Sequence, residues 1–192
     1  GISIYLTKPI QEDYLLVMPV GEGLSTLLHT QQQTLLFDTG PYFRGYDSAA
    51  SIIVPTLKNV NIRQLNTIIL SHDNQQHVGG TRTLRRAFPD ANIVTHPSLH
   101  NLITDSILCQ TYSFTSSNLT VDALPTHKSC GLKVTTNDAI VWLIANISPS
   151  EWKYLTRNND APDIVLFPNK GRSKGYVIPD HWKNVILIGS TQ

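Results

Sequence analysis

The chain has 192 residues, of which 41% are hydrophobic and 15% charged, and its formal net charge is +1. The apolar content excludes a disordered chain, and the near-neutral charge excludes nucleic-acid binding driven by overall charge. We find no signal peptide and no apolar run of the ~18 residues that a membrane span needs. We expect one domain over residues 1–192, and the start at Gly1 suggests a fragment of a longer chain.

The first half of the chain alternates between strand and helix patterns. Short apolar runs bounded by Pro, Gly or Asp predict strands, whereas apolar residues on one side of a 3.6-residue period predict helices. The predicted strands cover 15–18, 24–28, 34–37, 67–70 and 93–95, and the predicted helices cover 48–57, 81–88 and 98–103.

The second half consists mostly of strands. They are predicted over 119–124, 131–135, 139–144, 163–167 and 185–188, with a short helix over 151–156. Strands dominate, but helices occur in both halves. This order predicts an α/β sandwich of two mixed β-sheets with helices on the outside.

Polar motifs follow two of the predicted strands. Asp38 begins a turn after the strand 34–37, and His72 and His77 lie in the loop after the strand 67–70. A buried strand that delivers two histidines to the start of a helix is typical of a metal-binding loop. The loops after the strands 34–37, 67–70, 139–144 and 163–167 are therefore expected to converge at one edge of the sandwich.

The order of the motifs resembles the metallo-β-lactamase superfamily, and within it the C-terminal domain of ComEC-type competence proteins. The resemblance implies the αββα fold and an inner-membrane channel as the parent protein. Such channels pass single-stranded DNA into the cell during natural transformation, and a nuclease activity on the non-transported strand is attributed to this domain. The matching segments are 19–25, 36–41, 48–57, 71–80, 129–134 and 165–172.

The ligand positions of this family are largely replaced. Its His-x-Asp-x-Asp-His pattern has Asn74 and Gln76 at the two aspartates, its Gly-Asp has become Ala145-Asn146, and its His-His-Gly has become Asn169-Lys170-Gly171. A two-metal site holds roughly four positive charges that carboxylates must offset, and amides offset none of them. We therefore expect no catalytic residue, no metal cofactor, and a vestigial site at Asp38, His72, Asn74, Gln76, His77, Asn146 and Asn169.

Other interpretations of the same residues remain open. His72 and His77 can be loop histidines hydrogen-bonded to backbone, and Asp38 can tie down backbone N–H groups. An active nuclease or phosphodiesterase that degrades the non-transported strand would use zinc or manganese at these three residues and Asp73. A purely structural or docking module would use none of them.

Two groups of cations are candidates for DNA contacts. Lys170, Arg172 and Lys174 form a basic cluster in the glycine-containing loop that has lost the imidazoles of the family, and Arg82, Arg85 and Arg86 follow the histidine motif on the predicted helix. They are either a solvated surface or a patch that binds phosphates weakly and without sequence preference. The expected partners are DNA and the rest of the channel, and no small-molecule substrate is inferred.

The chain has two cysteines, Cys109 and Cys130. Two unpaired buried thiols are the usual state in the cytosol, whereas a disulfide requires an oxidising compartment. The ComEC-type branch often carries cysteines at these two places. The resemblance therefore implies a disulfide and a domain that faces the periplasm.

Overall fold

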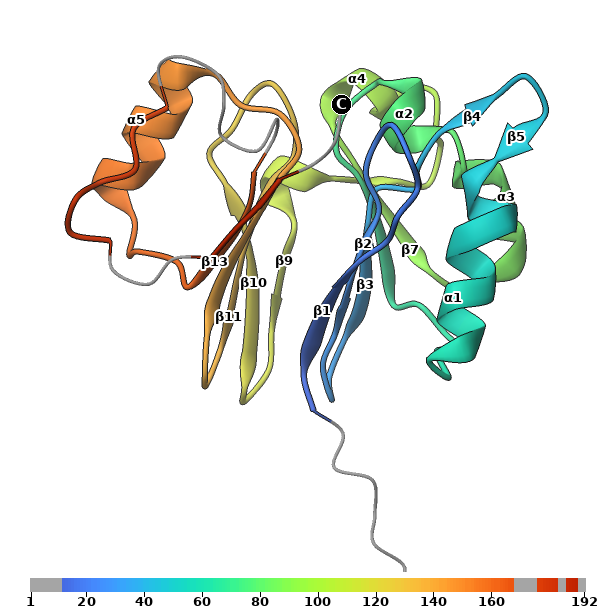
Figure 1. The fold of residues 1–192 in the computed structure, drawn as a ribbon, viewed down its shortest axis with the longest axis horizontal. Helices are drawn as coiled ribbons and strands as arrows, with labels where there is room; N and C mark the ends of the chain where they lie inside the picture. The colour runs from blue at the N-terminus through green and yellow to red at the C-terminus, as the bar shows by residue number, and fades with distance from the viewer. Residues whose placement is uncertain (1–11, 168–175, 183–185, 190–192) are drawn as a thin grey trace, which may run out of the picture.

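The computed structural model describes residues 12–167, 176–182 and 186–189. Within these residues two six-stranded mixed sheets face each other, with helices on both outer faces (Figure 1). The predicted αββα sandwich is confirmed. No helix in the described part of the chain is long and apolar enough to cross a membrane.

The first sheet has the order β1-β2-β3-β6-β7-β8. Strands β1 to β3 pair antiparallel, and β3, β6, β7 and β8 run parallel, so that the ends of β3 and β6 lie at the same sheet edge. Its strands are β1 (Tyr14–Val17), β2 (Thr26–His29), β3 (Thr34–Phe37), β6 (Thr67–Leu70), β7 (Asn92–Thr95) and β8 (Ile107–Leu108).

The second sheet has the order β14-β13-β12-β11-β10-β9. Strands β9 to β12 pair antiparallel, and β12, β13 and β14 are parallel. Its strands are β9 (Ser113–Thr115), β10 (Leu119–Leu124), β11 (Gly131–Thr136), β12 (Ile140–Ile144), β13 (Ile164–Phe167) and β14 (Ile186–Gly189).

The central strands β3, β6, β12 and β13 bury both of their faces, which explains why they are almost continuously apolar. Leu35 and Phe37 of β3 pack between the sheets, while Leu36 faces the helices of the first layer. In β12, Leu143 points between the sheets and Trp142 points to the outer side, where it packs against α5 (Pro149–Asn158). The two-residue alternation thus builds three apolar layers.

The helices of the first layer differ in detail from the prediction. The expected helix 48–57 begins as a π-helical turn, η1 (Ala49–Ile53), and continues as α1 (Val54–Asn59). Pro55 lies at the junction of η1 and α1, where it has no N–H to donate to the preceding helical turn. The remaining short helices are α2 (Gln75–Val78), which was not predicted, α3 (Thr81–Ala87), α4 (Pro97–His100) and the 3₁₀ turn η2 (Cys109–Thr111).

Most other predicted boundaries differ from the structure by one to three residues, as the following examples show. The strand expected over 24–28 covers 26–29, and that expected over 15–18 covers 14–17. The helix expected over 98–103 covers 97–100. In the first case Gly23, with φ 119°, ends a turn, and the backbone N–H of Leu24 bonds to Gln76 instead of a strand.

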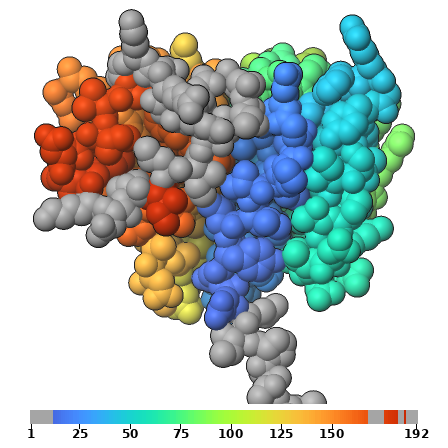
Figure 2. Space-filling view, in the orientation of Figure 1, coloured from blue at the N-terminus to red at the C-terminus, as the bar shows by residue number. Residues whose placement is uncertain are grey.

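A small hairpin, β4 (Tyr42–Phe43) and β5 (Tyr46–Asp47), was not predicted. Its turn places Arg44 and Gly45 at φ 46° and 80°, the left-handed conformation of a two-residue hairpin loop. The hairpin projects beyond α3 at the edge of the first sheet (Figures 1 and 2).

Candidate functional site

Three of the four loops that the sequence placed at one edge do meet there. The backbone N–H of Asp38 donates to the carbonyl of Ile69 at 2.9 Å, and that of Cys130 donates to Ser71 at 2.7 Å. The hydroxyl of Ser129 donates to the carbonyl of Asn146 at 2.6 Å, which ties the loop after β12 to the same place. The fourth loop, with Asn169, Lys170, Arg172 and Lys174, lies outside the described residues.

The carboxylate of Asp38 is the centre of this edge. It is fully buried, and its backbone is left-handed at φ 64°, a conformation that Asp tolerates better than most residues. Its Oδ1 accepts from the Ser71 N–H at 2.8 Å, and its Oδ2 accepts from the Ser71 hydroxyl at 2.7 Å and from His77 Nδ1 at 2.7 Å. Asp38 thus accepts three hydrogen bonds from the next loop.

Both histidines are oriented by this carboxylate. His77 donates its Nδ1–H directly to Asp38, since a carboxylate only accepts. The Ser71 hydroxyl gives its proton to Asp38, so it accepts from His72 Nδ1 at 2.9 Å. The imidazole rings of His72 and His77 lie 4.4 Å apart, and the buried Nε2 of His77 has no hydrogen-bond partner among the described residues.

His72 is held neutral by its surroundings. The pKa of His72 is lowered from 6.5 to about 4, mainly by burial and then by the neighbouring His77 and His96, against the opposing effect of Asp38 and Asp73. Removing water from around an imidazole penalises the charged form, because no solvent remains to stabilise it. At neutral pH His72 therefore carries no charge.

The two amides between the histidines are engaged in local structure. Asn74 Oδ1 accepts from the Gln76 N–H at 2.9 Å and so caps α2. Gln76 Nε2 donates to Glu22 Oε2 at 3.3 Å. The turn before β2 lies so close to α2 that a Cβ at Gly23 would be 1.9 Å from the Gln76 carbonyl oxygen.

The resemblance to the family implies a metal ion at this edge, which would need ligands from these residues. Histidines that ligate a metal almost always donate their other N–H to a carboxylate or carbonyl, and His72 and His77 have that arrangement. The described residues nevertheless contain no group of three His, Cys, Asp or Glu side chains that could hold an ion. His96 cannot complete one, because its Nε2 lies 2.8 Å from the carbonyl of His127. A catalytic zinc site uses three protein ligands, so the described residues do not supply enough ligands for the metal ion of the family.

The three arginines of α3 are all exposed, and they differ in position. Arg82 and Arg86 line a cavity of about 400 Å³ together with Tyr42 of the hairpin. Arg85 does not line this cavity. The sequence thus identified these cations but missed the aromatic side chain beside them.

Ser71 is the site residue that sequence reasoning missed. It links Asp38 to His72, yet a serine after a strand has many roles, and only the tertiary contact with Asp38 distinguishes this one. Its place immediately before His72 was the available signal.

The structure joins Cys109 and Cys130 in a disulfide, with their Cα atoms 5.9 Å apart. Cys109 follows β8 of the first sheet and Cys130 precedes β11 of the second, so the bond links the two sheets. Since the backbone of Cys130 also bonds to Ser71, the link lies next to the histidine loop.

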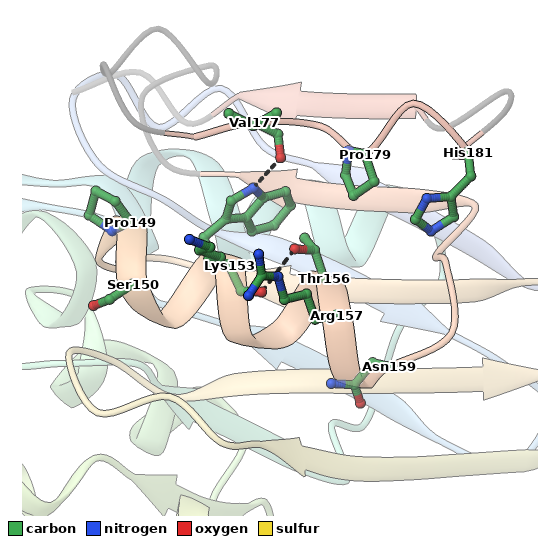
Figure 3. Close-up of a pocket in the computed structure, with 10 residues that line it drawn as sticks. Pro149, Ser150, Lys153, Thr156, Arg157, Asn159, Val177, Pro179 and His181 are labelled. Atoms are coloured by element: carbon green, nitrogen blue, oxygen red, sulfur yellow. Dashed lines mark hydrogen bonds between the residues drawn. The ribbon is translucent and has the colours of Figure 1, made fainter.

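A larger cavity than the one beside Tyr42, of about 880 Å³, lies elsewhere. It lies between α5 and the segment 176–182, and Lys153, Arg157 and His181 are among the residues that line it (Figure 3). Trp152 and Val177 also line it, and the indole N–H of Trp152 donates to the carbonyl of Val177 at 2.9 Å. None of the site residues named above lines it, so we place the candidate site at the converging loops.

This fold and this loop arrangement define the class of the protein. Residues 18–144 match the metallo-beta-lactamase superfamily, and the chain belongs to that family. The fold is similar to the metallo-β-lactamase GOB-18 from Elizabethkingia meningoseptica, with a TM-score of 0.59 and 15% sequence identity over 86% of this chain and 81% of that chain.

Two curated proteins are more similar in sequence. Recombination protein 2 of Haemophilus influenzae is 40% identical over 97 residues, which are 50% of this chain and 12% of that protein. Competence protein ComA of Neisseria gonorrhoeae is 39% identical over 72 residues, which are 38% of this chain and 10% of that protein. The matched parts thus span about a tenth of these relatives.

Proposed function

We propose that this chain is a domain of a ComEC-type DNA-uptake protein that contacts DNA but does not hydrolyse it. The observation that carries the proposal is the engagement of Asn74 and Gln76. The side-chain oxygen of Asn74 caps α2, and Gln76 donates its Nε2–H to Glu22, so the oxygen of Asn74 is already engaged and neither residue offers the charge of a metal-binding carboxylate. In this proposal the Asp38–Ser71–histidine network supports the loops in place of catalysis.

The similarity to Recombination protein 2 and Competence protein ComA supports the place of the domain in natural transformation. The parent would lie in the bacterial inner membrane, and this domain would face the periplasm. A disulfide between Cys109 and Cys130 fits an oxidising compartment such as the periplasm.

The absence of hydrolysis is tested on purified protein dialysed against excess zinc or manganese and then against metal-free buffer. We expect less than one ion in ten chains by elemental analysis, and no cleavage of single- or double-stranded DNA in either metal. Stoichiometric metal together with metal-dependent cleavage would overturn the proposal.

An active metal-dependent nuclease is the second candidate, and one observation favours it. The buried Nε2 of His77 has no partner in the described structure, and the ring centroid of the neutral His72 lies 4.4 Å from that of His77. These are properties of metal ligands. If this candidate holds, His77→Asn abolishes cleavage and metal retention together.

The proposed DNA contact would be weak, indifferent to sequence and steeply dependent on salt, because phosphates would be bound by cations alone. The candidate contributors are Lys170, Arg172 and Lys174 with Arg82 and Arg86, the two arginines of α3 that line a cavity. Changing the three loop residues to Gln should weaken binding at low salt, whereas EDTA should have no effect. Binding that does not respond to salt would contradict this part of the proposal.

A further inference from the structure

The hairpin β4–β5 displays aromatic side chains to solvent. Tyr42 is 50% exposed, Phe43 52% and Tyr46 36%, although each hydrophobic side chain of this size would normally gain stability from burial. In the space-filling view the hairpin stands out from the surface at the upper right (Figure 2). Neither the core nor the Asp38 network accounts for these three rings.

The hairpin is fixed in place despite its small size. Asp47 Oδ1 accepts from the N–H of Ala49 at 2.9 Å, and its Oδ2 accepts from the Thr83 hydroxyl of α3. The other strand of the hairpin lies against Gly79, where a Cβ would be 2.2 Å from the backbone nitrogen of Tyr42. The aromatic side chains are therefore displayed by an anchored element, so that little ordering is needed on binding.

Tyr42 and two arginines share one concave site. Tyr42, Arg82 and Arg86 line the cavity of about 400 Å³ between the hairpin and α3. Among the described residues no carboxylate forms an ion pair with either arginine. Asp47 is the acidic residue of the lining, and both of its oxygens already accept hydrogen bonds. The cavity thus offers two unpaired guanidinium groups beside an aromatic ring.

The other two rings lie on the opposite face of the hairpin. Tyr42 is paired in register with Asp47, and Phe43 with Tyr46. Side chains of successive strand residues point to opposite faces, so Phe43 and Tyr46 turn away from the cavity. Their ring centroids are 5.5 Å apart, which makes them one continuous aromatic surface.

We propose that the hairpin and the α3 arginines form a binding site for single-stranded DNA. Arg82 and Arg86 bind backbone phosphate, one base stacks on Tyr42, and a neighbouring base reaches Phe43 and Tyr46 around the hairpin. Unpaired bases expose the faces that stack on such rings, whereas a duplex hides them. This inference rests on the proposed DNA contact and names the form of DNA that is bound.

Fluorescence anisotropy with three labelled probes of equal length tests the site: an oligo-dT strand, the corresponding duplex, and an abasic strand that keeps the phosphates. We expect the unmodified protein to prefer oligo-dT over both other probes. Tyr42→Ser and Phe43→Ser/Tyr46→Ser should each weaken oligo-dT binding by about fivefold or more, with no change for the abasic strand.

Arg82→Gln/Arg86→Gln should weaken binding of all three probes and make the salt dependence shallower, by about 1.4 in log–log slope for the two single strands. Arg85→Gln is the matched control, since it lies on the same helix outside the cavity, and Tyr154→Ser is the control for the aromatic changes, because Tyr154 is 54% exposed on α5. Both controls should bind as the unmodified protein does, and circular dichroism should show every variant folded.

The outcomes separate the two proposals. DNA binding that is unaffected by the hairpin changes, or equal for oligo-dT and duplex, overturns the single-strand site while the DNA contact itself stands. No binding of any probe at low salt overturns both. If the hairpin changes abolish binding to anionic lipid vesicles but not to oligo-dT, the aromatic rings serve a membrane surface and the inference is wrong.

Discussion

His77 Nδ1 and Asp38 Oδ2 lie 2.7 Å apart, and the two side chains are 1% and 0% exposed. A hydrogen bond of this kind, between groups that water does not reach, is costly to break from one side only. Because Asp38 also receives both donors of Ser71, it joins the end of β3 to the whole histidine loop. Structural integrity of the site edge therefore depends on one carboxylate.

Asp38→Ala should lower the free energy of unfolding by about 3–5 kcal/mol, since it leaves buried donors of Ser71 and His77 without an acceptor. Urea denaturation followed by circular dichroism measures this. Asp73→Ala is the control, because this neighbouring carboxylate is exposed, and it should stay within about 0.5 kcal/mol of the unmodified protein. Equal effects of the two changes would contradict a special role for Asp38.

His72 should make stability depend on pH in a defined window. Its pKa is about 4 in the folded chain against 6.5 ordinarily, so between these values the unfolded state binds more protons. Stability from this group is complete above pH 6.5, falls as the pH drops towards about 4, and changes no further below that.

The measurement is the urea midpoint between pH 7 and pH 5, a range above the ordinary pKa values of carboxylates. His72→Gln should make this midpoint less dependent on pH, whereas His181→Gln, at an exposed position, should not. An unchanged pH dependence in the His72 variant would show that another group is responsible.

Restoring acidic residues should restore metal affinity. Asn74→Asp/Gln76→Asp recreates the family pattern beside two imidazoles that Asp38 already orients. Asp caps a helix as well as Asn does, so α2 should remain intact. We expect zinc to be retained after dialysis by this variant and not by the unmodified chain. Gln75→Asp adds charge at an exposed neighbouring position and should retain none; zinc loss from the double variant would refute the charge argument.

Reduction of the disulfide should cost about 3 kcal/mol of stability, as expected for a bond between residues 21 apart in the sequence. Cys109→Ala/Cys130→Ala in an otherwise unchanged chain should give the same loss without reductant. Thermal unfolding with and without reductant, in both proteins, measures it. A reductant effect that persists in the double variant would have another origin.

The buried strands were predictable because the residues within each short run are sufficient to identify it. Residues 34–37 and 67–70 are short β-branched or leucine-rich runs bounded by polar turns, and a strand covered on both faces needs little else. The hairpin β4–β5 was not predictable, because strands of two residues are too short to show a periodic pattern. The helix α5 was predicted too short, although Ser148 and Glu151 form a capping box that the sequence displays.

The candidate site was only partly predictable for a similar reason. Motif spacing assigned Asp38, His72 and His77 to one place, and the structure brings them together. The direction of the Ser71 hydroxyl depends on the neighbouring loop, which is 33 residues away in sequence. Likewise, the cap by Asn74 and the bond from Gln76 to Glu22 arise from the packing of α2, so spacing could identify the replaced residues but not their new contacts.

The disulfide also determines how the chain would respond to mechanical tension. Cys109 and Cys130 close a covalent ring that contains β9 and β10. If the two ends of the chain are pulled, the load passes through the sulfur atoms and bypasses the ring. The segment 110–129 therefore cannot be drawn out, and the extension gained on full unfolding is shorter by that length for as long as the bond is intact.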